Sequence, residues 1–364
     1  MKTLLAVLSV CAIALFECAP ARAATLYISA YPNLILIFDE AKGQIVDQIK
    51  LETGLPVGMR LSLDRKKIYV ITNDNSGVEV LDLATRKITN HFVLNSGNKR
   101  YRFYSGTPDP QDKVLYTVTT EIEKQADRYE IGKPKYTVIG LAEQKITKTF
   151  DVPHEDEQSG SYRFGGFEVS PDGKYLYQFG QTVNILSTDD FKVVDKIDLA
   201  KPDLPGMEQV GVGGGSLDSI SEPGRRISLS NWSDPVVHSR LFGIARFDLS
   251  TRQFDFTPIG PPPNGMSGLQ VAPDKKNAYT VISTGSQGNK RCEFWAFDLV
   301  STKIAHTAEV PCRSRFSFGM SGDGKKLYIY GAGFEIEVYD AATLKYEKTW
   351  DLNHDVTGGL IVLP

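Results

Sequence analysis

Short apolar runs alternate with polar turns along almost the whole chain, and this pattern repeats. An apolar residue followed by tyrosine opens such a run at six places: Leu26-Tyr27, Ile68-Tyr69, Leu115-Tyr116, Leu176-Tyr177, Ala278-Tyr279 and Leu327-Tyr328. Ile227-Ser228 fills the remaining gap, so that seven copies follow one another at spacings of 42 to 61 residues. Repeats of this length indicate solenoids, arrays or propellers, and the strand content of each copy selects among them.

Two further marks accompany each copy. One is an alternating apolar stretch that ends in a polar turn and restarts, as in "VEVLDLATRKI" at 78–88 and "IEVYDAATLKY" at 336–346. Such a stretch predicts a β-hairpin. The other mark precedes the tyrosine, as in "FEVSPDGK" at 167–174 and "FGMSGDGKK" at 318–326. Each unit is therefore predicted to contain four strands, a to d, with short turns between a and b and between c and d.

Seven four-stranded units in series predict an all-β protein, a seven-bladed β-propeller. The chain enters its first unit at strand b, and its last residues, "TGGLIVLP", have the pattern of a strand a with no strand b after them. We therefore expect the C-terminal strand to complete the first blade and close the ring, which removes an open sheet edge. No helical periodicity interrupts the pattern.

The turn "SPDGK" at 170–174 allows three interpretations: a phosphate cradle, a metal loop or a tight turn. A phosphate loop needs a helix after it, and a calcium loop needs more acidic ligands. Pro171 presets φ, Asp172 can accept a backbone hydrogen bond ahead, and Gly173 permits positive φ. The sequence therefore favours a turn. The glycine run "VGVGGGS" at 210–216 is likewise predicted to be an inner strand, where glycine permits crowding.

The N-terminus, "MKTLLAVLSVCAIALFECAPARA", carries Lys2, an apolar run and an A-x-A site. It predicts a cleavable signal peptide over 1–23 and a single propeller domain over 24–364. A lipid-attachment site at Cys18 is disfavoured because Glu17 precedes it, where such a site has a small residue. No other segment is apolar enough to predict a membrane span.

Cys292 and Cys312 remain once the predicted signal peptide is removed. They flank a predicted hairpin whose turn is centred near Thr302, and each lies ten residues from that centre. Directly opposed residues of an antiparallel pair can have the short Cα separation that a disulfide requires. We predict a disulfide between them in the oxidising environment of an exported protein. A catalytic or cofactor-bearing thiol pair is the alternative.

Composition and motifs exclude several function classes. A formal net charge of −3 gives no basic surface for nucleic acid. The five histidines show no metal-ligand spacing, and neither a G-x-S-x-G motif nor a Ser/His/Asp order can be recognised. We therefore predict no metal site and no catalytic residue in this chain.

The connections predict two different faces of the ring. The a–b and c–d turns are short and similar, and they define a uniform face. The d–a and b–c connections are long and irregular, and they define a variable face; they occupy 119–135, 151–162, 200–209, 232–240, 258–265 and 283–291. Binding residues concentrate on long loops carried by a rigid scaffold, so the variable face is the candidate functional face.

Four arginines are candidate binding residues on that face. They are expected near the starts of the inner strands, around the channel mouth: Arg60, Arg102, Arg163 and Arg315. Several guanidinium groups converging on one mouth would attract an anion or an acidic partner surface. In the alternative interpretation, each arginine pairs with a neighbouring carboxylate or lies apart from the others on the rim.

The unit "SPDGKYLY" followed by a "VxDxxT" hairpin resembles the YVTN-type repeat of exported bacterial propellers. Within that class the chain resembles the propeller (β) subunit of quinohaemoprotein amine dehydrogenase. The likeness includes the third-blade insertion "TEIEKQADRYEIGKPKYTVIGLAEQK" (120–145), the fourth blade, and the C-terminal segment "MSGDGKKLYIYGAGFEIEVYDAATLKYEKTWDL".

The resemblance implies a non-catalytic scaffold subunit of a periplasmic amine dehydrogenase, an oxidoreductase. It implies no cofactor on this chain: a small partner subunit carries a quinone, and a dihaem cytochrome subunit carries haem c. The absence of a C-x-x-C-H motif agrees with this. The alternative is a stand-alone periplasmic propeller that binds a small anionic ligand or a protein partner at its variable face. A propeller lactonase or lyase would require convergent histidine and acidic side chains at the channel, which the sequence does not indicate.

Overall fold

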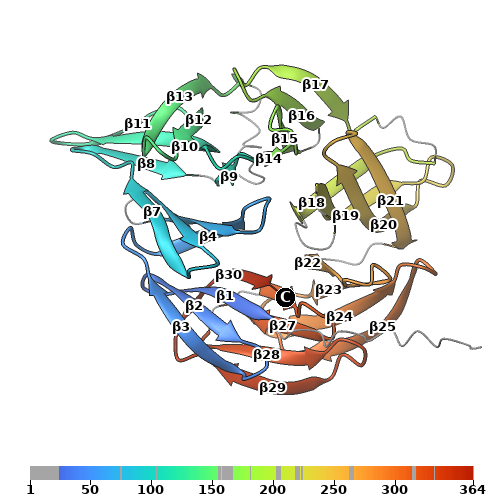
Figure 1. Ribbon diagram of the computed structural model, residues 1–364. Helices are drawn as coiled ribbons and strands as arrows, with labels where there is room; N and C mark the ends of the chain where they lie inside the picture. The colour runs from blue at the N-terminus through green and yellow to red at the C-terminus, as the bar shows by residue number, and fades with distance from the viewer. Residues whose placement is uncertain are drawn as a thin grey trace, which may run out of the picture.

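The computed structural model describes residues 24–363, apart from 74–75, 104, 155–156, 158–166, 181, 202–205, 218–221, 223, 262–265, 314–316 and 332. The predicted signal peptide, Arg163 and Arg315 lie outside the described residues. In the described part of the chain, seven antiparallel sheets stand around a central axis as the blades of a propeller (Figure 1). The prediction of a seven-bladed all-β propeller is confirmed.

The strands of each blade are given from the axis outward. The first blade consists of β30 (Val356–Leu363), β1 (Thr25–Ala30), β2 (Leu34–Asp39) and β3 (Gln44–Lys50). The second consists of β4 (Pro56–Leu61), β5 (Lys67–Thr72), β6 (Gly77–Asp82) and β7 (Lys87–Val93). The third consists, in chain order, of β8 (Lys99–Phe103), β9 (Thr107–Pro108), β10 (Val114–Lys124), β11 (Tyr129–Ile131), β12 (Lys135–Gly140) and β13 (Lys145–Asp151). In this blade β8 and β9 pair with the inner side of β10, and β11 and β12 pair with different stretches of its other side.

The remaining blades follow the four-stranded plan. The fourth consists of β14 (Phe167–Val169), β15 (Tyr175–Phe179), β16 (Thr182–Ser187) and β17 (Val193–Asp198), and the fifth of β18 (Val210–Leu217), β19 (Arg225–Ser233), β20 (Arg240–Asp248) and β21 (Gln253–Gly260). The sixth consists of β22 (Met266–Val271), β23 (Asn277–Thr284), β24 (Arg291–Asp298) and β25 (Lys303–Val310), with the 3-10 helix η1 (Gln287–Asn289) between β23 and β24. The seventh consists of β26 (Ser317–Met320), β27 (Lys326–Tyr330), β28 (Glu335–Asp340) and β29 (Tyr346–Asp351).

The ring closes through its C-terminus, as the sequence predicts. β30 pairs antiparallel with β1, from Thr25 opposite Leu363 to Ala30 opposite Val356. Strand b of the first blade thereby gains the inner neighbour that the N-terminal part of the chain does not supply. The backbone ladder between the two strands shifts register between Ile28 and Ala30, and it covers the inner edge of β1.

Burial follows the position of each strand in its blade. Strands b and c are buried on both faces because each blade is packed between two neighbours, as in β5, where five of six residues are buried. Outer strands such as β7 alternate between exposed and partly covered positions. The apolar cores lie between adjacent blades: Tyr27 and Ile37 of the first blade pack with Ile68 and Val70 of the second.

The recurrent "SPDGK" segment is a tight turn stabilised by its own side chains. The Ser170 hydroxyl donates to Asp172 at 2.6 Å and accepts from the backbone N–H groups of Lys174 and Tyr175. Gly173 adopts φ of 74°, the left-handed conformation that glycine takes without strain. The equivalent turn at Ser321 has the same pattern, with the hydroxyl donating to Asp323 at 2.7 Å. The turn interpretation of this motif is confirmed.

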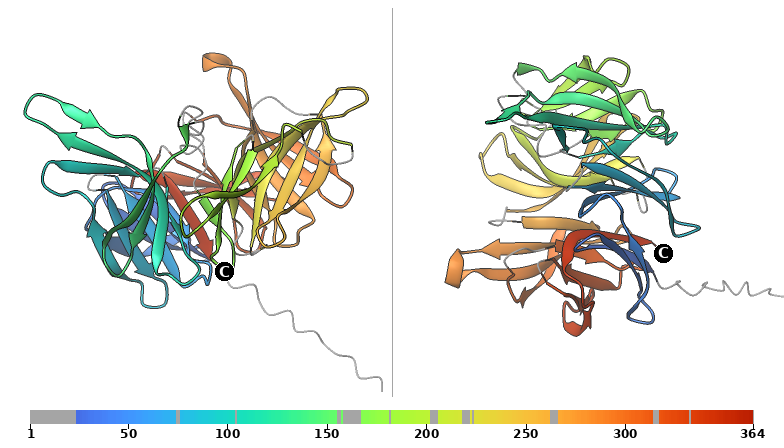
Figure 2. Two further views of the ribbon diagram at one scale, coloured as in Figure 1. Left: turned by 90° about the horizontal axis from the view of Figure 1, so that it is seen from above. Right: turned by 90° about the vertical axis from the view of Figure 1, so that its left-hand side faces the viewer.

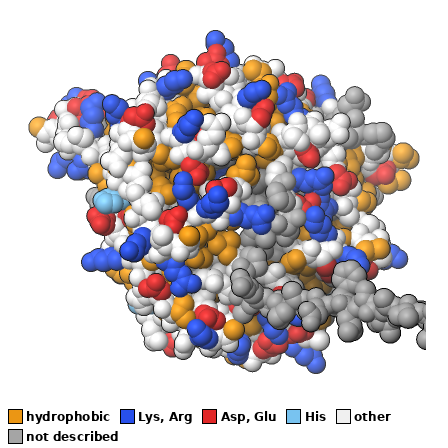
Figure 3. Space-filling view, in the orientation of Figure 1, with side chains coloured by type: hydrophobic (Ala, Val, Ile, Leu, Met, Phe, Trp, Pro, Cys, Tyr) orange, Lys and Arg blue, Asp and Glu red, His pale blue; other side chains and the backbone are white. Residues whose placement is uncertain are grey.

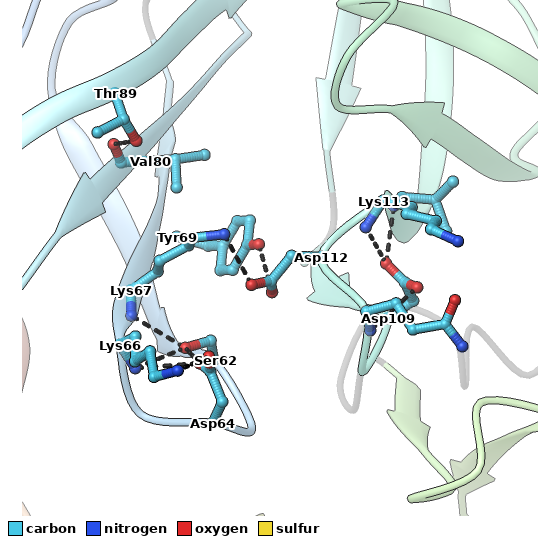
Figure 4. A network of polar contacts seen from close by, with 12 residues as sticks. Ser62, Asp64, Lys66, Lys67, Tyr69, Val80, Thr89, Asp109, Asp112 and Lys113 are labelled. Carbon is cyan, nitrogen blue, oxygen red and sulfur yellow. Dashed lines mark hydrogen bonds and ion pairs between the residues drawn. The ribbon is translucent and has the colours of Figure 1, made fainter.

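The repeated tyrosines join neighbouring blades. The Tyr69 hydroxyl of the second blade donates to Asp112 in the a–b turn of the third at 2.6 Å, and Lys67 approaches the other carboxylate oxygen at 2.8 Å (Figure 4). Tyr177 donates to the Leu249 carbonyl of the fifth blade at 2.5 Å, and Tyr328 donates to Glu40 of the first blade. The hydroxyl reaches the next blade in each case, so the tyrosine stabilises a seam between blades.

The seam after the fifth blade is built differently. The tyrosine position is occupied by Ser228 there, and Ile227, Phe242 and Phe297 form an apolar cluster between the fifth and sixth blades. The gap in the repeat therefore corresponds to a seam that is held by hydrophobic packing.

Both views of Figure 2 place the long connections on one side of the ring and the C-terminus on the other. The third-blade hairpin and the loops around residues 236 and 288 project from the first side, which is the variable face. Among the described residues, no helix has the length and apolar character needed to cross a membrane.

Candidate functional site

Arg60 lies close to the uniform face, so the expectation that it would line the mouth on the variable face is wrong. It is the fifth of six residues of β4, and the a–b turn at Ser62 follows almost at once. Inner strands run from the variable face toward this turn. A residue near the end of such a strand therefore lies near the opposite end of the channel from the long loops.

The charge of Arg60 is compensated by the neighbouring blades. Its Nη1 donates to the Thr107 hydroxyl at 2.8 Å and to the Phe167 carbonyl at 3.3 Å, and its Nη2 forms an ion pair with Glu168. Thr107 belongs to the third blade, and Phe167 and Glu168 belong to the fourth. One guanidinium group thus connects the inner strands of three consecutive blades.

The network continues into the fifth blade through Arg226. Its Nη1 lies 3.5 Å from Glu168 Oε1, and its guanidinium carbon lies 4.3 Å from the centre of the Phe179 ring. Arg226 is only 5% exposed and Glu168 only 4%. Burial lowers the pKa of Arg226, and the adjacent Glu168 carboxylate partly offsets this effect. A buried carboxylate between two guanidinium groups is stabilising only while each charge keeps its partners.

A sequence rule locates these residues. The register places Arg60, Thr107 and Glu168 directly opposite the repeat tyrosines of their blades. Gln270 holds the same position opposite Tyr279, and its amide donates to the Phe318 carbonyl of the seventh blade at 3.3 Å. This position faces the following blade, as the tyrosine itself does. The residue nine places before each of these tyrosines is therefore a candidate inter-blade contact, a signal that the sequence contained.

Arg102 lies elsewhere, on the exposed surface of β8 opposite Thr120 of β10. It belongs to an extension of the third blade and not to the end of the channel that holds Arg60. Of the four predicted arginines, the two that the structure describes are not brought together. Arg60 matches the alternative interpretation, in which an arginine pairs with a carboxylate.

The extension of the third blade is the most distinctive element of the variable face. β10 has eleven residues, and beyond Thr119 its partners are no longer ring strands but β8 on one side and β11 on the other. We call β8, residues 119–124 of β10 and β11 the projecting lobe. It extends past the ring in Figure 1 and in the left view of Figure 2. Its turn is closed by Gln125, whose N–H donates to the Arg128 carbonyl at 2.8 Å.

The projecting lobe exposes large apolar side chains. Tyr129 is 64% exposed and Ile131 is 73% exposed. Both lie on β11, the edge strand of the lobe, which offers unpaired backbone groups on its outer side. Natural sheets usually protect an open edge strand against pairing with another chain. Apolar side chains exposed on such a strand therefore favour contact with another surface.

The predicted disulfide is confirmed. Cys292 and Cys312 are bonded, with a Cα–Cα distance of 5.3 Å. The predicted register is wrong, because Cys292 lies opposite Val310 and Cys312 lies two residues beyond the end of β25. The pairing of Asp298 with Lys303 centres the turn before Thr302, which shifts the register, and the β-bulge between Ala296 and Phe297 offsets this shift by only one residue. The bridge therefore ties the hairpin to the segment that leads into the seventh blade.

The histidines lie apart from one another. His154 is 3.9 Å from Glu157, and His238 lies 2.8 Å from Glu208. Within the described residues, no three His, Cys, Asp or Glu side chains are grouped so that they could hold a metal ion.

No family model matches the sequence, and no curated protein is similar to it in sequence. Solved structures resemble the fold. A functionally unknown protein from Desulfotomaculum acetoxidans has a TM-score of 0.57 at 12% identity, covering 94% of this chain and 99% of that chain. A candidate 6-phosphogluconolactonase from Bacteroides fragilis has a TM-score of 0.53 at 13% identity, with 95% and 99% covered.

The dihydro-heme d1 dehydrogenase NirN has a TM-score of 0.50 at 14% identity, with 93% of this chain and 75% of that chain covered. At such identities the likeness shows the propeller fold alone. Fold does not determine function, so the function must be argued from the surfaces of this protein.

Proposed function

We propose that this protein is an exported, non-catalytic propeller that serves as a docking scaffold for partner proteins on its variable face. The observation that carries the proposal is the projecting lobe, which displays Tyr129 and Ile131 beyond the ring. Tyrosine and isoleucine exposed together on a rigid strand can be buried by a partner at little entropic cost, and tyrosine is enriched among residues that dominate binding energy.

The geometry gives less support to a stand-alone anion-binding propeller. Arg60 is already neutralised by Glu168 and lies near the uniform face, while Arg102 lies on the projecting lobe. An anion site at the variable-face mouth would need several cations to converge there, and Arg60 and Arg102 do not.

The sequence resemblance suggests which assembly the scaffold serves. Residues 120–145, which resemble the third-blade insertion of the amine dehydrogenase propeller subunit, include the outer part of β10 and all of β11. We therefore propose a subunit of a periplasmic amine dehydrogenase, beside a small quinone-bearing subunit and a dihaem cytochrome. The quinone and the haem c would belong to those partners, and this chain would position them. The predicted signal peptide and the disulfide are compatible with an oxidising periplasm.

Isolation from the source organism tests this function. The full-length chain would be expressed there with a C-terminal affinity tag, purified natively and sized. We expect a complex larger than the monomer that contains c-type haem absorbance, a small subunit that stains for redox-cycling quinone, and amine-dependent reduction of an electron acceptor. A monomer that elutes without haem would refute the scaffold role. A stable complex without haem or quinone would refute the amine dehydrogenase assignment and leave the scaffold role intact.

A further inference from the structure

The two faces of the projecting lobe differ in chemistry. Residues that lie directly opposite in an antiparallel sheet share a face, so the register assigns every side chain of the lobe. Face one, the acidic face, carries Lys99, Tyr101, Phe103, Thr119, Glu121, Glu123 and Glu130. Face two, the basic–apolar face, carries Arg100, Arg102, Thr120, Ile122, Lys124, Tyr129 and Ile131. None of the seven residues of the basic–apolar face is acidic.

The acidic face is already occupied by contacts within the chain. Tyr101 and Phe103 pack against the apolar core next to the second blade. Glu121 accepts hydrogen bonds from the Lys99 ammonium at 2.8 Å and from the Tyr101 hydroxyl at 2.7 Å. Glu123 accepts one from the Asn98 amide at 2.9 Å. This face holds the lobe on the ring, and its carboxylates are satisfied there.

The basic–apolar face lies on the opposite side of the same strands, away from the second blade. Ile122 and Ile131 are cross-strand neighbours at its centre, and Lys124 lies opposite Tyr129. Arg100 lies opposite Ile122, and its guanidinium contacts only backbone carbonyls of Gly97 and Lys99 among the hydrogen bonds of the described chain. Its charge is therefore not balanced by a carboxylate there. In Figure 3 the lobe lies at the left of the ring, where basic, acidic and hydrophobic side chains are all visible.

We propose that the basic–apolar face of the projecting lobe docks an acidic protein surface, and this inference rests on the scaffold function proposed above. The occupant follows from charge complementarity: Arg100 and Lys124 flank an apolar centre, so the partner should offer carboxylates around an apolar patch. The apolar centre supplies affinity when Tyr129 and Ile131 are buried. The cations at its rim supply steering and register and reject basic partners.

Site-specific photocross-linking in the source organism tests this inference on the full chain. Tyr129 is replaced by p-benzoylphenylalanine, and cross-linked peptides are identified by mass spectrometry. The same replacement at Val236, which is 82% exposed on another connection of the variable face, is the positional control. We expect a cross-link from position 129 to a different protein, at a peptide rich in Asp and Glu, and a yield well above that from position 236.

A charge-reversed variant separates electrostatic docking from contact by proximity. Arg100→Glu together with Lys124→Glu should lower the cross-link yield by at least about tenfold, because like charges then face each other across the interface. Lys66→Glu together with Lys325→Glu makes the same change in net charge on exposed turns of the uniform face and should leave the yield unchanged. Raising the salt concentration should reduce the yield for the wild-type chain.

The outcomes distinguish this inference from the function on which it rests. A complex that persists with an undiminished cross-link in the Arg100→Glu, Lys124→Glu variant would overturn the inference and leave the scaffold function standing. So would a cross-link to a basic peptide, to a second copy of this chain or to another segment of the same chain. A wild-type chain found only as a monomer, with no cross-link above the Val236 control, would overturn both.

Discussion

Removal of a single hydroxyl, in Tyr69→Phe, tests whether the repeat tyrosines stabilise the seams between blades. Tyr69 is 1% exposed, and its hydroxyl donates to the Asp112 carboxylate of the next blade at 2.6 Å. Burial, and then the hydrogen bond to Asp112, raise the pKa of Tyr69 well above its usual value, so the hydroxyl remains a donor at neutral pH. Phenylalanine keeps the ring packing and removes only this donor.

The expected cost is that of one charge-assisted hydrogen bond, about 1.5–3 kcal/mol of unfolding free energy. The lower end is the better expectation, because Asp112 keeps the Lys67 ammonium at 2.8 Å. Tyr279→Phe is the matched control. Tyr279 occupies the same repeat position, yet within the described residues no hydrogen bond from its hydroxyl to the next blade is found. Its replacement should change the unfolding free energy by less than about 0.5 kcal/mol.

Urea denaturation followed by tyrosine and tryptophan fluorescence measures both variants. A double-mutant cycle with Asp112→Asn isolates the contact, and asparagine tolerates the positive φ of 56° at this position. We expect a coupling energy of about 1–2 kcal/mol between the two substitutions. If Tyr69→Phe costs no more than Tyr279→Phe, or if the coupling is zero, the tyrosines serve packing alone and the seam argument is wrong.

Three further predictions concern other sites. Glu79 is fully buried, and its Oε1 accepts three hydrogen bonds of 2.7 Å. Glu79→Ala should therefore lower the unfolding free energy measured in urea by about 3 kcal/mol or more. Glu79→Gln keeps that oxygen and should cost less than half as much. Replacing both Cys292 and Cys312 by serine opens a covalent loop of sequence separation 20 and should lower the unfolding free energy by about 2–4 kcal/mol. Dithiothreitol should lower the unfolding free energy of the wild-type chain by a similar amount and leave that of the variant unchanged. Hydrogen bonds from Ser250 and Thr251 lower the pKa of Asp248 from 3.8 to about 2. The unfolding free energy should therefore fall as the pH is lowered from about 4 to about 2. Asp248→Asn should flatten that part of the curve of unfolding free energy against pH.

Much of the fold could be predicted because each blade repeats a local code. The Ser170 side chain of "SPDGK" bonds only to groups within the next five residues, and each tyrosine strand is a short apolar run. Neither feature needs information from distant parts of the chain. Counting these units predicted seven blades, and the unpaired C-terminal strand pattern predicted the closure by β30. The disulfide partners were predictable for the same reason, since both cysteines belong to one hairpin.

The candidate site was less predictable. Its contacts depend on how far along the channel each inner-strand residue lies and on which neighbouring blade its side chain faces. Arg60 bonds Glu168, which is 108 residues away, since ring closure brings the inner strands of three blades within reach of one side chain. The sequence shows Arg60 just before the a–b turn, but it does not show that Glu168 of the fourth blade lies within reach of its side chain. Likewise, the turn of the sixth-blade hairpin is centred before Thr302, and this places Cys292 opposite Val310 and not opposite Cys312.

The amino-acid sequence by itself determined the repeat, the turns, the number of blades and the order in which they follow, because period-two alternation and turn chemistry act over a few residues. Only the tertiary structure decided which charges meet and which remain exposed. The register of β10 with β8 and β11 separates the lobe into an acidic face against the ring and a basic–apolar face toward solvent. A shift of one residue in that register would exchange the two faces, and pairing of this kind is set by the packing of the whole blade.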